Sequence, residues 1–182
     1  MTFLPLVLQA VLLAVAIVAA IYDARYRRIP NWLVLAGLLL GLGLNAFLSE
    51  WAGLRSSLLG IGLAFLIYFP LYLLRGMGAG DVKLMAAVGA IGGWANWLGI
   101  FFLTAIVGGI AAIALLIGKR QMARGFSNVG YLIMQLLSFR LPYARKEELD
   151  ITSQKSIKLP HGVMIAWGCV LYMGAAWLWA PR

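Results

Sequence analysis

The chain has 182 residues, of which 63% are hydrophobic and 12% are charged, and its formal net charge is +9. An ordinary soluble domain carries about twice that share of charged residues, so the composition excludes this class and indicates a bilayer protein. The basic residues flank apolar segments instead of following one aromatic-rich surface, which favours membrane anchoring and argues against a nucleic-acid partner.

Five apolar segments have about the length that a membrane span requires, which is about 20 residues. They are residues 3–21, 32–48, 56–74, 97–117 and 160–180. A further apolar segment, Leu84 to Trp94, rises only about 16 Å as a helix, so we expect a short fourth span that turns at Gly92-Gly93. The predicted fold is therefore an all-α membrane protein with six transmembrane helices, forming one domain over residues 1–182.

Basic residues orient the predicted bundle, because Lys and Arg favour the cytoplasmic side of short loops. With both termini outside, only Arg55 and Arg182 of the fifteen basic residues fall on the outer side. This arrangement places the polar connection 119–158 in the cytoplasm. Within it, residues 126–143 alternate polar and apolar positions at helical spacing, which predicts an interfacial amphipathic helix.

Two of the acidic residues occupy unusual positions. The six acidic residues are Asp23, Glu50, Asp81, Glu147, Glu148 and Asp150. Four of them lie in predicted loops or turns, where a solvated surface explains them. Asp23 and Asp81 instead border apolar spans, where a carboxylate is costly and calls for a reason.

The predicted topology brings Asp23 and Asp81 to similar depth, because the first span ends and the fourth span begins on the same side. Two facing carboxylates can share a proton, so that one acts as a base on water and the other as an acid toward a scissile carbonyl. Gly76, Gly78 and Gly80 precede Asp81 at alternate positions and permit close approach of an extended peptide. Taken singly, Asp81 also fits a helix N-cap and Asp23 a juxtamembrane charge.

The only cysteine, Cys169, lies in the last apolar segment, so the sequence offers no disulfide framework and no paired-cysteine metal site. We predict that the protein uses no metal and no cofactor.

Three stretches together resemble the prepilin peptidase family of Gly-x-Gly-Asp membrane aspartyl proteases. Residues 23–31 read DARYRRIPN, an aspartate followed six residues later by Ile-Pro-Asn. Residues 78–83 read GAGDVK and match the Gly-x-Gly-Asp signature. Residues 159–165 read LPHGVMI and resemble the Pro-x-Gly-x-x-Ile segment that opens the last span.

The resemblance implies an aspartic endopeptidase with Asp23 and Asp81 as the catalytic pair. Its expected partners are the lipid bilayer and prepilin or pseudopilin precursors, cleaved after a short basic leader at the cytoplasmic face of the bacterial inner membrane. The chain is similar to the compact peptidases of tight-adherence (Flp) pilus systems and to archaeal preflagellin peptidases, so an archaeal membrane is an alternative location. Bifunctional members add an N-terminal domain with paired Cys-x-x-Cys motifs, so we expect no methyltransferase activity.

Five further residues are predicted to bind substrate or to support the site. They are Gly78, Gly80, Lys83, Pro30 and Asn31. Pro30 and Asn31 turn the chain into the second span and shape the Asp23 pocket. Lys83 fits contact with an acidic group of the precursor, tuning of Asp81 or anchoring at the membrane edge.

Two alternative functions use the same aspartates. A small membrane transporter would relay protons or bind a cation through them, but it would not need the glycine-rich stretch. A presenilin-like intramembrane protease shares Tyr22-Asp23 and Gly-x-Gly-Asp. The six-span count and the Ile-Pro-Asn motif favour the prepilin peptidase interpretation.

Overall fold

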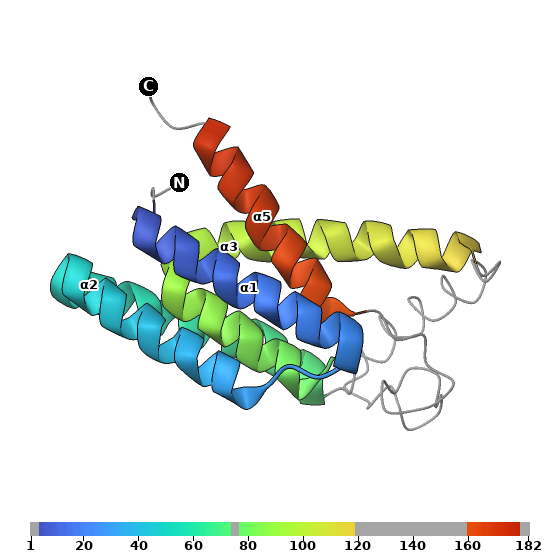
Figure 1. Ribbon diagram of the computed structural model, residues 1–182, viewed down its shortest axis with the longest axis horizontal. Helices are drawn as coiled ribbons and strands as arrows, with labels where there is room; N and C mark the ends of the chain where they lie inside the picture. Colours follow the sequence, from blue (N-terminus) through green and yellow to red (C-terminus); the bar gives the residue numbers. More distant parts are fainter. Residues whose placement is uncertain (1–3, 74–76, 119–159, 179–182) are drawn as a thin grey trace.

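A computed structural model describes residues 4–73, 77–118 and 160–178, and in these ranges it contains helices and no strand. The helices are α1 (Leu6–Tyr26), α2 (Asn31–Leu73), α3 (Ala79–Gly118) and α5 (His161–Leu178) (Figure 1). All four are long and apolar enough to cross a membrane. The predicted all-α fold with membrane-length helices is confirmed. The loop 119–158 and its predicted amphipathic helix lie outside the described residues.

Helix α2 is interrupted at Ser49 and Glu50, whose backbone angles are not helical. Gly41 packs against Ala90 of α3, and Gly60 packs against the adjacent Gly89. In a straight helix the two α2 glycines would lie about 28 Å apart. The interruption therefore folds α2 back on itself, and Figure 1 shows this turn at the far left of the molecule.

Helix α3 is interrupted at Gly93, whose φ of 71° and ψ of 170° favour glycine. The Trp97 indole N–H donates a hydrogen bond of 3.0 Å to the Met85 carbonyl oxygen, although a straight helix would separate these residues by about 18 Å. The turn predicted at Gly92-Gly93 is thus found. With the interruption in α2, the described residues form six helical segments within four helices.

The start of α3 differs from the sequence prediction. We expected a glycine-rich loop through Gly80 and a fourth span that begins at Asp81, but the helix begins at Ala79 and includes Gly80. The Gly78 carbonyl oxygen accepts hydrogen bonds from the backbone N–H groups of Asp81 and Val82. These bonds form the first helical turn before the apolar run from Leu84 starts. The glycine-rich composition of this stretch did not indicate a helix.

The first segment of α3 forms the centre of the bundle. Every residue from Leu84 to Gly93 is buried, and α3 packs against α1, α2 and α5. A helix that is apolar on all sides is stable only when it is surrounded. This segment spans about 21 Å from Ala79 to Gly92, and its burial agrees with the predicted short span within the bundle.

Polar groups of α2 satisfy the carbonyl groups that the break at Gly93 leaves without helical partners. Ser57 Oγ donates a hydrogen bond of 2.7 Å to the Ala90 carbonyl oxygen. Asn45 Nδ2 lies 3.1 Å from the same oxygen and 3.0 Å from that of Ile91. An unpaired carbonyl in an apolar bundle costs several kcal/mol, so these side chains stabilise the break.

Candidate active site

Asp23 lies in the last turn of α1 and is buried, with 8% of its surface exposed. Its Oδ2 accepts a hydrogen bond of 2.8 Å from the backbone N–H of Gly162, at the start of α5. Its backbone carbonyl accepts the N–H of Arg27, which ends α1 in a left-handed conformation. The carboxylate therefore faces the interior of the bundle and does not extend toward solvent as a juxtamembrane charge would.

Asp81 lies in the first turn of α3 and is half-buried. The Gly78 backbone N–H hydrogen-bonds to its carboxylate, while its own N–H donates to the Gly78 carbonyl oxygen at 3.1 Å. Negative charge is also favoured at a helix N-terminus. Asp81 is the third residue of α3 and not its N-cap residue, which is Gly78. Its carboxylate lies over Gly78, where a Cβ atom would be 3.2 Å from Asp81 Oδ2.

The two carboxyl groups are close enough to interact electrostatically. The end of α1 and the start of α3 thus lie at the same end of the bundle, as the predicted topology requires. His161 also interacts electrostatically with Asp23.

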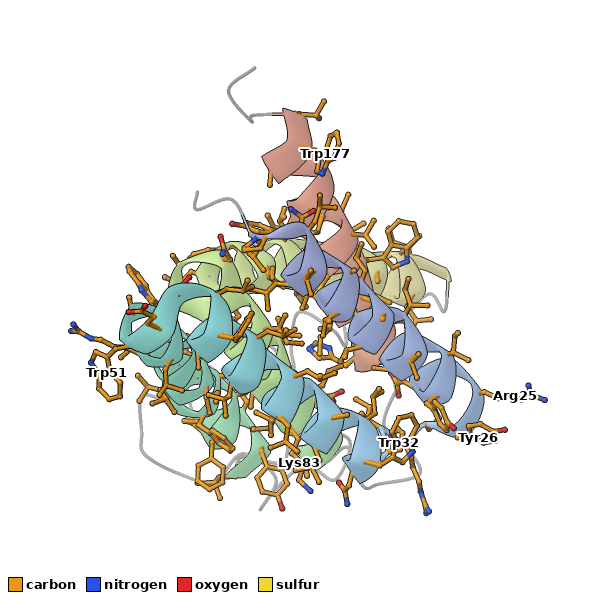
Figure 2. The ribbon with its side chains drawn as sticks, turned by 60° about the vertical axis from the view of Figure 1, so that its left-hand side comes forward. Arg25, Tyr26, Trp32, Trp51, Lys83 and Trp177 are labelled. Atoms are coloured by element: carbon orange, nitrogen blue, oxygen red, sulfur yellow. The ribbon has the colours of Figure 1, made fainter. Side chains whose placement is uncertain are left out.

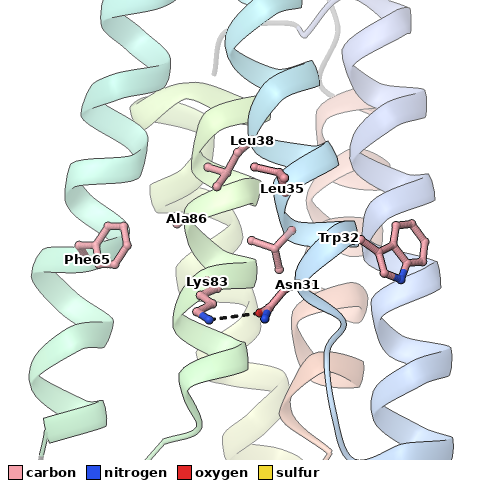
Figure 3. Close-up of a pocket in the computed structure, with 8 residues that line it drawn as sticks. Asn31, Trp32, Leu35, Leu38, Phe65, Lys83 and Ala86 are labelled. Atoms are coloured by element: carbon pink, nitrogen blue, oxygen red, sulfur yellow. Dashed lines mark hydrogen bonds between the residues drawn. The ribbon is translucent and has the colours of Figure 1, made fainter.

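The predicted supporting residues link the same ends of the helices. Lys83 Nζ donates a hydrogen bond of 3.1 Å to Asn31 Oδ1, which connects α3 to the start of α2 (Figure 3). The Pro30 carbonyl oxygen accepts the N–H groups of the first turn of α2. Gly80 packs against Ile29, and a Cβ atom at Gly80 would lie 3.4 Å from the Ile29 side chain. The Ile-Pro-Asn and Gly-x-Gly-Asp stretches are therefore in direct contact.

A groove of about 420 Å³ opens beside this contact, between the two segments of α2 and the start of α3. Figure 3 shows Leu35, Leu38 and Phe65 along it and the Lys83–Asn31 hydrogen bond at one end. The lining residues are Asn31, Trp32, Val34, Leu35, Leu38, Phe65, Lys83 and Ala86. Lys83 is the one charged side chain among them.

Aromatic and basic side chains gather at the same end of the molecule. Figure 2 shows Arg25, Tyr26, Trp32 and Lys83 there, whereas Trp51, beside the turn within α2, and Trp177, near the end of α5, lie away from them. The Tyr22 and Trp32 rings meet edge to face, with centroids 6.3 Å apart, and so join α1 to α2. Aromatic rings and basic groups are typical of the membrane–water interface.

Sequence reasoning placed residues 159–165 in a motif but assigned no contact to Gly162. The structure makes Gly162 a direct hydrogen-bond donor to Asp23. The sequence feature that could have indicated this contact is the glycine at the start of the last apolar segment, directly after the only histidine of the chain. Across the described ranges, no group of three His, Cys, Asp or Glu residues is arranged to hold a metal ion.

Comparison with known proteins gives similarity over the region that holds both aspartates. Residues 10–113 match the type IV leader peptidase family. The chain is 33% identical over 104 residues to a prepilin leader peptidase/N-methyltransferase of Pseudomonas putida, covering 53% of this chain and 36% of that protein. It is 33% identical over 130 residues to a protein of the same description from Escherichia coli K12, covering 66% and 57%. No solved structure matches the chain significantly.

Proposed function

Because the chain belongs to the type IV leader peptidase family, we propose that it is a membrane aspartyl endopeptidase that removes the short basic leader of prepilin-like precursors. The matched region covers 36% of the Pseudomonas putida protein and 57% of the Escherichia coli protein. The activity must therefore be measured with this chain itself. We place the reaction at the cytoplasmic face of a bacterial inner membrane, with Asp23 and Asp81 as the catalytic pair.

The observation that carries this proposal is the arrangement of the two carboxyl groups. Asp23 and Asp81 come from different helices, interact electrostatically, and each accepts a hydrogen bond from a glycine N–H. Carboxylates within an apolar bundle are costly and are typical of functional sites. A merely structural cap would need one of these aspartates, whereas water activation by a carboxyl pair needs both.

In the proposed reaction, the ionised member of the pair takes a proton from a water molecule, and the water oxygen attacks the scissile carbonyl carbon. The protonated member gives its proton to the carbonyl oxygen, so the tetrahedral intermediate is neutral. On collapse the C–N bond breaks, the carboxyl group that took the water proton gives it to the departing amine, and the other carboxylate takes back the proton of one hydroxyl group of the intermediate. The carboxyl pair then returns to its singly protonated state.

Six membrane spans with the N-terminus outside remain part of the proposal. The interruptions in α2 and α3 divide four helices into six segments. A Cβ atom at Gly168 would contact Thr104, and one at Gly99 would contact Tyr172, so the second segment of α3 runs antiparallel to α5. The basic residues Arg25, Arg27 and Lys83 beside the ends that carry Asp23 and Asp81 support a cytoplasmic position for those ends.

The direct test uses the purified full-length chain in detergent with candidate prepilins and pseudopilins. The proposal predicts one new N-terminus, directly after the basic leader, when the product is sequenced or weighed by mass spectrometry. Absence of cleavage for every candidate, with the enzyme monodisperse and folded, would favour the transporter interpretation.

A further inference from the structure

We propose that Gly162 is a positioning residue of the active site, whose backbone N–H orients the Asp23 carboxylate for proton transfer. This inference rests on the proposed peptidase function and adds α5 to a site that the Asp23 and Asp81 stretches alone would place on α1 and α3. The juxtaposition joins residues 139 positions apart in the sequence.

The hydrogen bond is a short and buried one. Gly162 N lies 2.8 Å from Asp23 Oδ2, and both residues are buried. The first N–H groups of a helix have no partner within the helix, so the start of α5 has a donor to offer. A bond to an ionised acceptor is stronger than one between neutral groups.

The position leaves little room for a side chain. A Cβ atom at Gly162 would lie 3.0 Å from Asp23 Cβ and 3.1 Å from Asp23 Oδ2. Distances of this size are closer than nearly all Cβ contacts, so the aspartate or the helix would have to shift. The absence of a side chain is therefore what lets the N–H group reach the carboxylate.

A glycine backbone N–H at the start of a helix bonds to each aspartate carboxylate. Gly78 N–H bonds to the Asp81 carboxylate at the start of α3, and Gly162 N–H bonds to Asp23 at the start of α5. The bond to Oδ2 fixes the orientation of the Asp23 carboxylate. A displacement of about 1 Å in such a group can cost about 100-fold in rate.

The first experiment compares Gly162→Ala with Gly174→Ala, both in α5. Gly174 is exposed, and a Cβ atom there would meet nothing within 4 Å. We expect Gly162→Ala to lower kcat by up to about 100-fold while the KM for a prepilin and the thermal unfolding midpoint stay close to the parent values. Gly174→Ala should match the parent in all three quantities.

A positioning role and a packing role give different results in this experiment. Loss of activity in proportion to the loss of folded Gly162→Ala protein would overturn the inference, as would parent-like kcat. Cleavage by the parent enzyme in the same assay establishes the proposed function separately. If the parent enzyme does not cleave, the proposed function is rejected. The hydrogen bond between Gly162 and Asp23 is tested by a second measurement that does not depend on cleavage.

That second measurement needs no change at Gly162. His161 is the only histidine and directly precedes Gly162, so protein with carbonyl-¹³C histidine and ¹⁵N glycine has a single His–Gly amide signal in a carbonyl-correlated NMR spectrum. We expect the Gly162 amide proton to resonate far downfield and to move upfield in Asp23→Asn. Asp81→Asn should move it less. A Gly162 signal that is unchanged by Asp23→Asn would overturn the inference.

Discussion

Lys83 Nζ donates a hydrogen bond of 3.1 Å to Asn31 Oδ1, and this bond joins the Gly-x-Gly-Asp stretch to the Ile-Pro-Asn stretch. Lys83 comes two residues after Asp81, and Asn31 begins α2. The contact therefore links the helix that carries Asp81 to the turn that follows Asp23, the two proposed catalytic residues. We interpret Lys83 as a support of the site through this bond.

The first prediction is that Lys83 and Asn31 act as a pair. Lys83→Met and Asn31→Ala should each reduce kcat/KM by a similar, modest factor, and the double variant should resemble either single variant. Because the pair is exposed, its contribution to stability should be about 1 kcal/mol or less. A double-mutant cycle on prepilin cleavage measures this coupling. Fully additive losses would contradict the pairing.

The second prediction concerns the close approach of α2 and α3. A Cβ atom at Gly41 would lie 2.7 Å from the backbone of Ala90 and Ile91, so Gly41→Ala should separate the helices and destabilise the protein by about 1–3 kcal/mol. Gly43, in the same segment, has open space around it. Gly43→Ala should leave stability unchanged or raise it by up to about 1 kcal/mol.

Apparent thermal unfolding midpoints in one detergent compare these two variants directly. A shift of about 2–4 °C per kcal/mol is expected for a chain of this size. Equal midpoints for Gly41→Ala and Gly43→Ala would show that the glycine contact does not limit the separation of the helices.

The third prediction is the orientation of the helices. A phosphatase reporter fused after Glu50, at the turn within α2, should be active as an external domain. The same reporter fused after Gly118, at the end of α3, should be inactive and cytoplasmic. External activity after Gly118 would contradict six spans and the common membrane depth of the two aspartates.

Much of this arrangement was predictable because it follows from charge placement and length. The basic residues indicated that the end of α1 and the start of α3 lie on one side, and in the structure Asp23 and Asp81 are close enough to interact electrostatically. The adjacent glycines and the short apolar run predicted the turn that occurs at Gly93. Charge placement, segment length and glycine position do not depend on contacts between distant residues, so they can be read from a single sequence.

Other features depend on packing between distant segments. The hydrogen bond from Gly162 to Asp23 is donated by a backbone N–H group. The residue types therefore give no sign of this bond except the glycine itself. Asn45 and Ser57 looked like ordinary polar residues, yet they satisfy the carbonyl groups exposed by the break in α3. Helix α3 includes Ala79 and Gly80 because the Gly78 carbonyl oxygen accepts the first helical hydrogen bonds, whereas the glycine content of this stretch predicted a loop.

The most direct test of the carboxylate pair is the cleavage rate of Asp23→Asn, Asp81→Asn and the double variant, with Glu50→Gln as the control. Glu50 is exposed at the turn within α2, so its replacement should leave cleavage unchanged. Each single aspartate variant should insert and fold normally but lose cleavage about 10⁴-fold or more, and the double variant should be no worse than either. Near-parental cleavage of a prepilin by either folded single variant would contradict the aspartyl-protease mechanism.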